Sequence, residues 1–256
     1  MMNKSIIILV LAFVTVSLKA QNVFVASAKI TYEKKLNLQR QMADNTWLSD
    51  DAKDKMKKYV TTLWDYNFNE TTSSYKAQKK DANASDMMFA FSSGQNTSEM
   101  YTDLGKSKRI IKKSIMGEDY ILPDTIPNLD WKIMHDVRKI AGYDCRKAIA
   151  VINDSVYVVA FYTDEILLKG GPEGFTGLPG MILGLAIPRY NTTWFATKVE
   201  SVNVPIYAIS EPAKGKRADN EKEFKKLIDM YTRYDDKKNP RKIEDIKKSL
   251  YGFLLQ

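Results

Sequence analysis

The chain holds one cysteine and one histidine, and these are the first side chains to consider for chemistry. Cys145 and His135 lie ten residues apart, a spacing that suggests a nucleophile beside its general base. Ala141-Gly142 between them predicts a tight hairpin turn, which sets Cys145 opposite Arg138 and His135 on the other face of the sheet. A register shifted by one residue leaves the pair about 13 Å apart, too far for proton transfer. We therefore predict that Cys145 is a buried packing residue and that no Cys/His dyad forms.

Other catalytic and metal-binding constellations lack the residues that they need. A zinc or copper site needs more than one His and one Cys, and neither HExxH nor CxxC occurs. GxSxG is also absent, so a hydrolase would depend on carboxylates such as Asp164 and Glu165, which are ordinarily solvated at the end of a strand. Asp50, Asp51 and Asp54 lack the spacing of a calcium loop and fit the capping of a helix. The sequence thus predicts no catalytic residue, no metal ligand and no cofactor.

Half of the 12 glycines stand in one window, GGPEGFTGLPGMILG at 170–184. A phosphate-binding loop would need GxxxxGK[ST], and a flexible linker would be polar, whereas Phe175, Leu178 and Met181 are apolar. The glycine triplets are too few for a collagen helix. Pro179 and Gly180 occupy the second and third positions of a type II turn. We therefore interpret the window as an ordered, partly buried corner whose glycines serve backbone geometry.

The N-terminus and the charge pattern restrict the location and the partners of the protein. Residues 1–20 combine an early lysine, an apolar run and a short exit ending in Ala20, which is typical of a secretory signal peptide. We expect cleavage after Ala20 and an exported mature chain that does not span a membrane. The net charge is +8, but the lysines stand in scattered pairs. This pattern argues against nucleic acid as a partner, with attraction to anionic lipid head groups as the alternative to a merely solvated surface.

Two periodicities predict the elements that position these residues. Alternation with the period of a strand predicts strands over 23–38, two within 61–80, short ones near Met100, Arg109 and Tyr120, a meander over 131–168, and two more beginning near Met181 and Trp194. Ser49 as a cap, followed by acids in the first turn and lysines in the last, predicts a helix over 50–60. Helical spacing predicts two amphipathic helices in a C-terminal segment, 219–254.

These elements predict one mainly β (α+β) domain over 21–256. We expect a curved antiparallel sheet or half-barrel, with one short helix in the N-terminal half and two C-terminal helices. The layout is similar to that of the LolA lipid carriers, a likeness of architecture alone.

The stretch from Ile140 to Leu183 resembles the GLPGLI family of exported proteins of Gram-negative bacteria, through IAGYDCRKA, AFYTDEI and GPEGFTGLPGMIL. The naming hexapeptide stands at 177–182, with Met181 in place of leucine. Phe161 and His135 also depart from the family pattern, which weakens any shared role for His135. The residues that match the family corner are Gly171, Pro172, Phe175, Gly177, Leu178, Pro179, Gly180, Met181 and Ile182, and the other matching residues are Gly142, Tyr143, Cys145, Lys147, Ala148, Tyr162 and Thr163.

The resemblance implies a cell-envelope protein, in the periplasm or associated with the outer membrane, without assigned catalytic residues. Its members often accompany TonB-dependent receptors, so an outer-membrane receptor or other envelope protein is the expected partner. Asp124-Thr125-Ile126 and Asp154-Ser155-Val156 resemble the sites at which some such bacteria attach O-glycans, with unmodified turns as the alternative.

Three functions follow from these expectations. The first is non-enzymatic binding of a lipid, peptide or protein partner on the concave face of the sheet. The second is a structural accessory role beside a TonB-dependent receptor. The third, and least favoured, is a hydrolase that uses carboxylates.

The interpretation of the glycine window makes a prediction about Gly180. Replacing Gly180 with Val should lower the free energy of unfolding by about 1 to 3 kcal/mol, because a side chain strains the turn. Chemical denaturation measures this change. A variant of unchanged stability that has lost binding to a partner would instead assign the window to function.

Overall fold

The computed structural model describes residues 25–43, 49–78, 99–115, 117–152, 156–219 and 221–233. The predicted signal peptide at 1–20, the predicted turn and glycan site around Ser155, and the second C-terminal helix lie outside these residues. Within the described ranges, no helix is long and apolar enough to cross a membrane.

Twelve strands of the described chain form one sheet, in the order β12-β6-β5-β4-β3-β2-β1-β11-β10-β9-β8-β7. All neighbouring strands pair antiparallel except β12 and β6, which are parallel. The mainly β, mostly antiparallel fold predicted from the sequence is therefore confirmed. The strands are β1 (Ser27–Asn37), β2 (Tyr59–Asn69), β3 (Thr72–Ala77), β4 (Glu99–Asp103), β5 (Lys108–Ile115), β6 (Glu118–Thr125), β7 (Lys132–Ile140), β8 (Tyr143–Ile152), β9 (Val156–Thr163), β10 (Met181–Ile187), β11 (Thr192–Glu200) and β12 (Lys216–Arg217).

The alternation of β1 determines which face of the sheet is buried. Every second side chain from Ala28 to Leu36 is buried, and the residues between them are partly exposed. Antiparallel pairing then sets Ile30 opposite Tyr66, and Tyr32 opposite Trp64, on the same face. Large aromatic side chains in register bury much apolar surface per residue, so these central strands carry much of the hydrophobic core.

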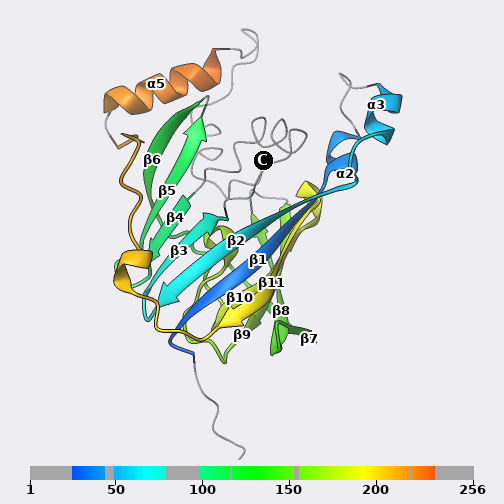
Figure 1. Ribbon diagram of the computed structural model, residues 1–256, viewed down its shortest axis with the longest axis vertical. Helices are drawn as coiled ribbons and strands as arrows, with labels where there is room; N and C mark the ends of the chain where they lie inside the picture. The colour runs from blue at the N-terminus through cyan, green and yellow to red at the C-terminus, as the bar shows by residue number, and fades with distance from the viewer. Residues whose placement is uncertain are drawn as a thin grey trace, which may run out of the picture.

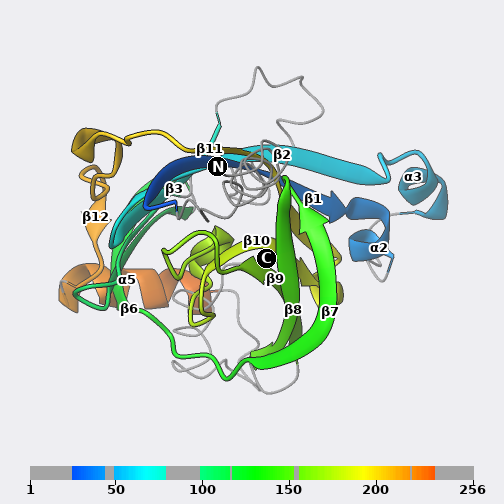
Figure 2. The ribbon, with the colours of Figure 1, turned by 90° about the horizontal axis from the view of Figure 1, so that it is seen from below.

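The sheet curls around its buried face, and one loop fills the curl. Figure 2 shows the strands following one another around the interior, with the yellow-green segment between β9 and β10 inside. This segment, residues 164–180, is called the plug below. Its apolar side chains Ile166, Leu168, Phe175 and Leu178 are buried in the two hydrophobic clusters of the interior. The sheet thus closes on part of its own chain.

The helices lie at the ends of the strands. Helix α2 (Leu38–Met42) and helix α3 (Asp50–Asp54) stand near the ends of β1 and β2, and α5 (Glu221–Thr232) lies near the end of β5 and β6 (Figure 1). The Ser49 side chain caps α3 by accepting from the Ala52 N–H, as its position suggests. The helix predicted over 50–60 is shorter than expected, because β2 begins at Tyr59 and its β-branched residues pair with β1.

Short 3₁₀ turns complete the described chain, namely η3 (Pro172–Gly174), η4 (Pro188–Tyr190) and η5 (Ile206–Ala208). Asn191, in the left-handed conformation, ends η4 and leads into β11.

The predicted hairpin between β7 and β8 is confirmed in its register. Ile140 pairs with Tyr143, and Arg138 pairs with Cys145. Ala141 and Gly142 have φ values of 49° and 92°, the left-handed pair that a two-residue turn of type I′ requires.

The turn at Pro179 differs from the predicted type II turn. The Gly180 N–H donates to the Leu178 carbonyl at 2.8 Å, which closes a three-residue turn around Pro179. Gly180 itself has a nearly extended φ of 159°, but a Cβ there would overlap the backbone carbonyl of Thr163. Glycine is needed because β9 passes too close for a side chain, so the loss predicted for Gly180→Val has a steric cause. Gly142→Val is the matched control. A Cβ at Gly142 would meet open space, so this variant reports backbone strain without a steric clash.

Candidate functional site

The two residues that first suggested chemistry are not brought together by the fold. Cys145 is fully buried and lies opposite Arg138, whereas His135 is exposed beyond an irregular stretch of the β7–β8 pairing. Burial raises the pKa of the Cys145 thiol to about 12, and its Sγ donates to the Tyr143 carbonyl at 3.6 Å. A thiol held neutral in this way is not activated as a nucleophile.

The carboxylates singled out in the sequence also remain separate. Asp164 and Glu165 are exposed at the end of β9, and Asp164 lies 3.7 Å from Arg146. Asp50 and Asp51 are exposed in α3. Among the described residues, no group of three or more His, Cys, Asp and Glu side chains is placed to hold a metal ion.

A different group of side chains lies on the concave face of the sheet and on the plug, and we call it the concave cluster. Each member comes from a different element: β1, β2, β3, β5, η3 and β11. The cluster consists of Lys34, Trp64, Tyr75, Lys113, Glu173 and Trp194.

A buried ion pair forms the centre of the concave cluster. The Lys34 Nζ donates to Glu173 Oε1 at 3.1 Å, and the Trp194 Nε1–H donates to the same oxygen at 3.0 Å. Lys34 and Glu173 are only 5% and 7% exposed. Lys34 lies directly opposite Trp194 in the β1–β11 register, and its ammonium stands 5.1 Å and 5.5 Å from the ring centroids of Trp194 and Trp64. One cation is thus held by a carboxylate and by two indole rings.

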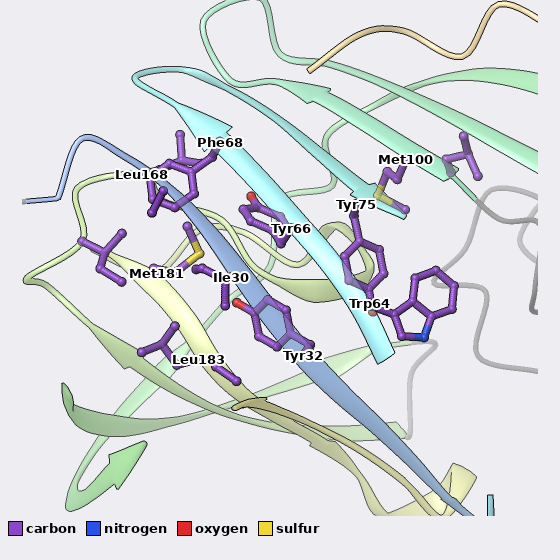
Figure 3. Close-up of a cluster of buried hydrophobic side chains, with 14 of the residues drawn as sticks. Ile30, Tyr32, Trp64, Tyr66, Phe68, Tyr75, Met100, Leu168, Met181 and Leu183 are labelled. Carbon is purple, nitrogen blue, oxygen red and sulfur yellow. The ribbon is translucent and has the colours of Figure 1, made fainter. Parts of the chain in front are cut away.

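Aromatic rings form the wall beside this pair. Trp64 and Tyr75 stack with their ring centroids 4.7 Å apart and an interplanar angle of 12°. Figure 3 shows the two rings lying together, with Tyr32 and Tyr66 on the same side of the sheet. Tyr75 is 3% exposed, and its hydroxyl has no hydrogen-bond partner within the described chain.

The surroundings of the Tyr75 hydroxyl explain its neutral form. Burial raises the pKa of Tyr75 well above its ordinary value, and the negative charge of Glu173 raises it further. The nearby Trp194 indole lowers this pKa. The hydrogen of that indole is directed at Glu173, so we take the Tyr75 hydroxyl as lacking a full hydrogen bond.

Lys113 adds a second cation to the concave face. Burial lowers its pKa to about 8, and the charge of Glu173 opposes this change. Lys113 forms no ion pair with a described residue, whereas its neighbour Lys112 lies 3.0 Å from Asp119 and 3.9 Å from Glu99. The ion-paired lysine and the unpaired lysine therefore stand side by side on opposite faces of β5.

The plug positions Glu173 at a local conformational cost. Glu173 has a left-handed φ of 55°, which is uncommon for a residue with a side chain. The following Gly174 packs so closely that a Cβ would overlap the Met100 sulfur. Burial raises the pKa of Tyr66 to about 12, and the polar groups of Ser73 and the Gly171 backbone oppose this rise. The glycines of the plug thus allow a charged side chain to reach the interior.

Sequence reasoning missed this site. The one available signal was Glu173 itself, an acid between glycines in an otherwise apolar window. The motif residues Phe175, Leu178, Met181 and Ile182 are buried, as packing residues of a corner would be.

The fold and the cluster define a curved antiparallel β domain that closes on its own glycine-rich plug. The chain belongs to the family described as N-glycanase peptide, N-terminal domain (PNGase_F-II_N), whose model matches residues 48–221, more than half of the chain. This range includes every member of the concave cluster except Lys34.

One solved structure supports this fold, and two more are reported beside it. The structure of PNGF-II in the C2 space group is similar, with a TM-score of 0.52 and 15% identity over 78% of this chain. The structure of PNGF-II in the P21 space group has a TM-score of 0.49, 16% identity and 77% coverage of this chain. This chain covers 32% of each PNGF-II chain, so it spans about a third of their length.

A crystal structure of an uncharacterized conserved protein from Thermus thermophilus has a TM-score of 0.40 and 6% identity, covering 77% of this chain and 93% of that chain. No curated protein matches the chain.

The family match corrects the resemblance drawn from the sequence. Assignment to the GLPGLI family was wrong, because the family model that fits extends over 48–221 and belongs to the N-glycanase N-terminal domain. The hexapeptide at 177–182 reflects a local constraint, because Gly180 lies too close to β9 for a side chain. Such a constraint can arise in unrelated chains, so the hexapeptide does not identify the family. The three functions predicted from the sequence are also withdrawn, because the family match points to an N-glycanase domain. They were binding of a lipid, peptide or protein partner on the concave face, an accessory role beside a receptor, and a carboxylate hydrolase.

The buried ion pair predicts a large effect of removing one charge. Replacing Glu173 with Gln leaves the Lys34 ammonium without its counter-charge, and we expect the free energy of unfolding to fall by about 3 to 5 kcal/mol. Urea denaturation measures the change. The double variant Lys34→Met/Glu173→Gln removes both charges and should recover most of the loss.

Asp51→Asn is the control for that experiment, because it breaks the exposed pair between Asp51 and Lys55. It should cost less than about 1 kcal/mol. Equal losses for Glu173→Gln and Asp51→Asn would show that the interior pair contributes no more than a surface pair.

The lowered pKa of Lys113 predicts how stability changes with pH. Below about 8 the folded protein bears the full penalty of burying the ammonium. Between about 8 and the unfolded value of 10.5 the folded state releases this proton while the unfolded state retains it, so the free energy of unfolding rises with pH. The stability difference between the parent and Lys113→Met should move in favour of the parent by up to about 3 kcal/mol across this window.

Denaturation at a series of pH values provides the measurement. Cys145 and the buried tyrosines titrate in an overlapping range with the opposite sign, and their contribution cancels in the difference between the two proteins. A difference that does not change with pH would contradict the burial of Lys113.

Proposed function

We propose that this chain is a glycan-recognition domain that acts together with an N-glycanase. The observation that carries the proposal is the family match over residues 48–221, which contains most of the concave cluster. The family is described by an N-glycanase, and a glycan-related role for this chain is inferred from its membership of that family.

The chemistry of the concave cluster supports a saccharide ligand. Sugars combine apolar ring faces with many hydroxyls, so their sites pair aromatic rings with a few directed polar groups. The cluster contains the stacked Trp64 and Tyr75 rings, which are buried, a phenolic hydroxyl that has no partner among the described residues, and the partly exposed Lys113 side chain. A partner that supplies hydroxyl oxygens would satisfy these groups.

We also propose that the chain does not catalyse glycan release by itself. Its thiol is buried and neutral, its histidine is exposed, and the Glu173 carboxylate is already engaged by Lys34 and Trp194. The chain spans about a third of the length of PNGF-II, which leaves room for catalysis elsewhere in that longer protein.

We further propose that the sheet is a half-barrel with a LolA-like layout. This proposal concerns shape alone, and the curl of the sheet in Figure 2 supports it. Export with cleavage after Ala20 and an outer-membrane or other envelope partner also stay proposals, as does a lack of affinity for nucleic acid. A peptide ligand fits the proposal if the peptide bears the glycan.

Titration of the whole chain with an N-glycosylated peptide tests the recognition function. The chain should bind the glycopeptide and bind the same peptide without its glycan at least about tenfold more weakly. In NMR spectra the indole N–H signals of Trp64 and Trp194 should move more than that of Trp131, whose N–H donates to the Thr176 carbonyl. Equal affinity for both peptides would overturn the proposal.

Mass spectrometry of the same mixture tests the catalytic part. The glycopeptide should keep its mass during prolonged incubation with the chain. Release of the glycan above the rate in buffer would overturn the statement that the chain is not itself catalytic.

A further inference from the structure

The convex face of the sheet has a row of side chains that crosses five strands. Lys35 and Thr193 stand next in sequence to Lys34 and Trp194 of the concave cluster, so they point away from the interior. The register extends this row over β9, β10, β11, β1 and β2, through Val159, Ala186, Thr193, Lys35 and Thr61. All five side chains are at least partly exposed.

The next row toward one end of these strands holds exposed apolar side chains. Tyr157 of β9 pairs with Val151 of β8, and Tyr59 is the first residue of β2. These side chains are 62%, 47% and 43% exposed, respectively. Four strand spacings, or about 19 Å along the sheet, separate the two tyrosines. Exposed apolar side chains that share one end of one face indicate a contact surface.

Cations accompany these apolar side chains. The turn η4 joins β10 to β11 at the same end and exposes Arg189. The Lys35 Nζ lies 4.4 Å and the Lys58 Nζ 5.5 Å from the centroid of the Tyr59 ring, so at most the sum of these distances, 9.9 Å, separates the two ammoniums. Glu33, the next side chain of β1 on this face, forms no ion pair with either lysine. We define the rim as Lys35, Lys58, Tyr59, Val151, Tyr157 and Arg189.

The rim differs in charge from the other end of the same strands. There Lys29 of β1 lies 3.1 Å from Asp65, and Lys198 of β11 lies 2.8 Å from Glu200. The three cations of the rim form no ion pair with any residue that the structure describes. Unmatched positive charge therefore stands beside the exposed tyrosines, and the complementary partner is both anionic and apolar.

A bilayer with anionic head groups offers both properties at one surface. Its negative surface attracts lysine and arginine, and its interfacial layer suits tyrosine, which has an apolar body and a polar tip. Lysine stems lie along apolar surface while their ammoniums reach the head groups. Free phosphate would instead leave Val151 and Tyr157 exposed to water.

We propose that the rim docks this protein on an anionic lipid surface. Lys35, Lys58 and Arg189 contact the lipid phosphates, and Tyr59 and Tyr157 enter the interfacial layer. The contact is peripheral, and no lipid enters the curl of the sheet, in contrast to a lipid carrier. It uses the convex face, so it does not depend on glycan recognition by the concave cluster.

Co-sedimentation with lipid vesicles tests this contact. Vesicles of phosphatidylcholine alone are compared with vesicles that contain about 30% phosphatidylglycerol. The parent should bind the anionic vesicles at least about tenfold more tightly, and added salt should weaken this binding. Equal binding to both kinds of vesicle, or binding to neither, would overturn the proposal. Every protein compared keeps the same N-terminus, so the apolar run at 1–20 contributes equally.

Matched variants locate the contact. Lys35→Gln/Lys58→Gln should weaken binding to the anionic vesicles about tenfold. Lys29→Gln/Lys198→Gln removes the same charge at the other end of β1 and β11 and should change the affinity less than about twofold. Equal losses in the two double variants would assign the binding to net charge and overturn the rim.

Tyr157→Ser leaves the charge unchanged and should weaken binding about threefold, because an apolar ring is lost from the interface. Full binding by Tyr157→Ser would overturn the part of this ring. Displacement of the parent by inorganic phosphate, or tighter binding to a soluble acidic polysaccharide than to the anionic vesicles, would overturn the lipid as the ligand. Circular dichroism and thermal melting establish that each variant is folded.

Discussion

The arrangement of the interior depends on one ion pair between the sheet and the plug. Lys34 of the central strand β1 and Glu173 of the plug meet at 3.1 Å in a nearly dry environment, and Trp194 donates to the same carboxylate. Each charge would be strongly destabilising alone, so the pair is favourable only when the plug lies inside the curl. The interaction thereby specifies one position for a segment that apolar packing alone would hold less selectively.

The backbone of the plug is shaped to deliver that charge. Glu173 adopts a left-handed conformation. Gly174 and Gly180 lack the Cβ atoms that would overlap the Met100 sulfur and the Thr163 carbonyl. These local costs are tolerated because the surrounding contacts are numerous and apolar, with Phe175 and Leu178 fully covered. A glycine-rich sequence in this fold is therefore a means of bringing polar chemistry into a hydrophobic interior.

Short-range sequence patterns led both to the correct predictions of local structure and to the wrong family assignment. The β7–β8 hairpin was predictable because Ala141-Gly142 fixes its register within a few residues, and α3 was placed by its cap at Ser49. The helix was nevertheless predicted too long, since pairing of β2 with β1 overrides local propensity after Tyr59. The GLPGLI hexapeptide misled for a related reason, because a tight corner constrains glycines and prolines without specifying the family or the ligand.

By itself the sequence determined the mainly antiparallel sheet, the hairpin and the buried state of the single cysteine, because alternation and turn residues act between near neighbours. The tertiary structure alone decided the composition of the concave cluster. Lys34, Tyr75, Lys113 and Glu173 are up to 139 residues apart, and none stands in a motif that marks a site. Their meeting depends on the curl of the whole sheet and on the path of the plug, both of which arise from long-range packing and not from local spacing.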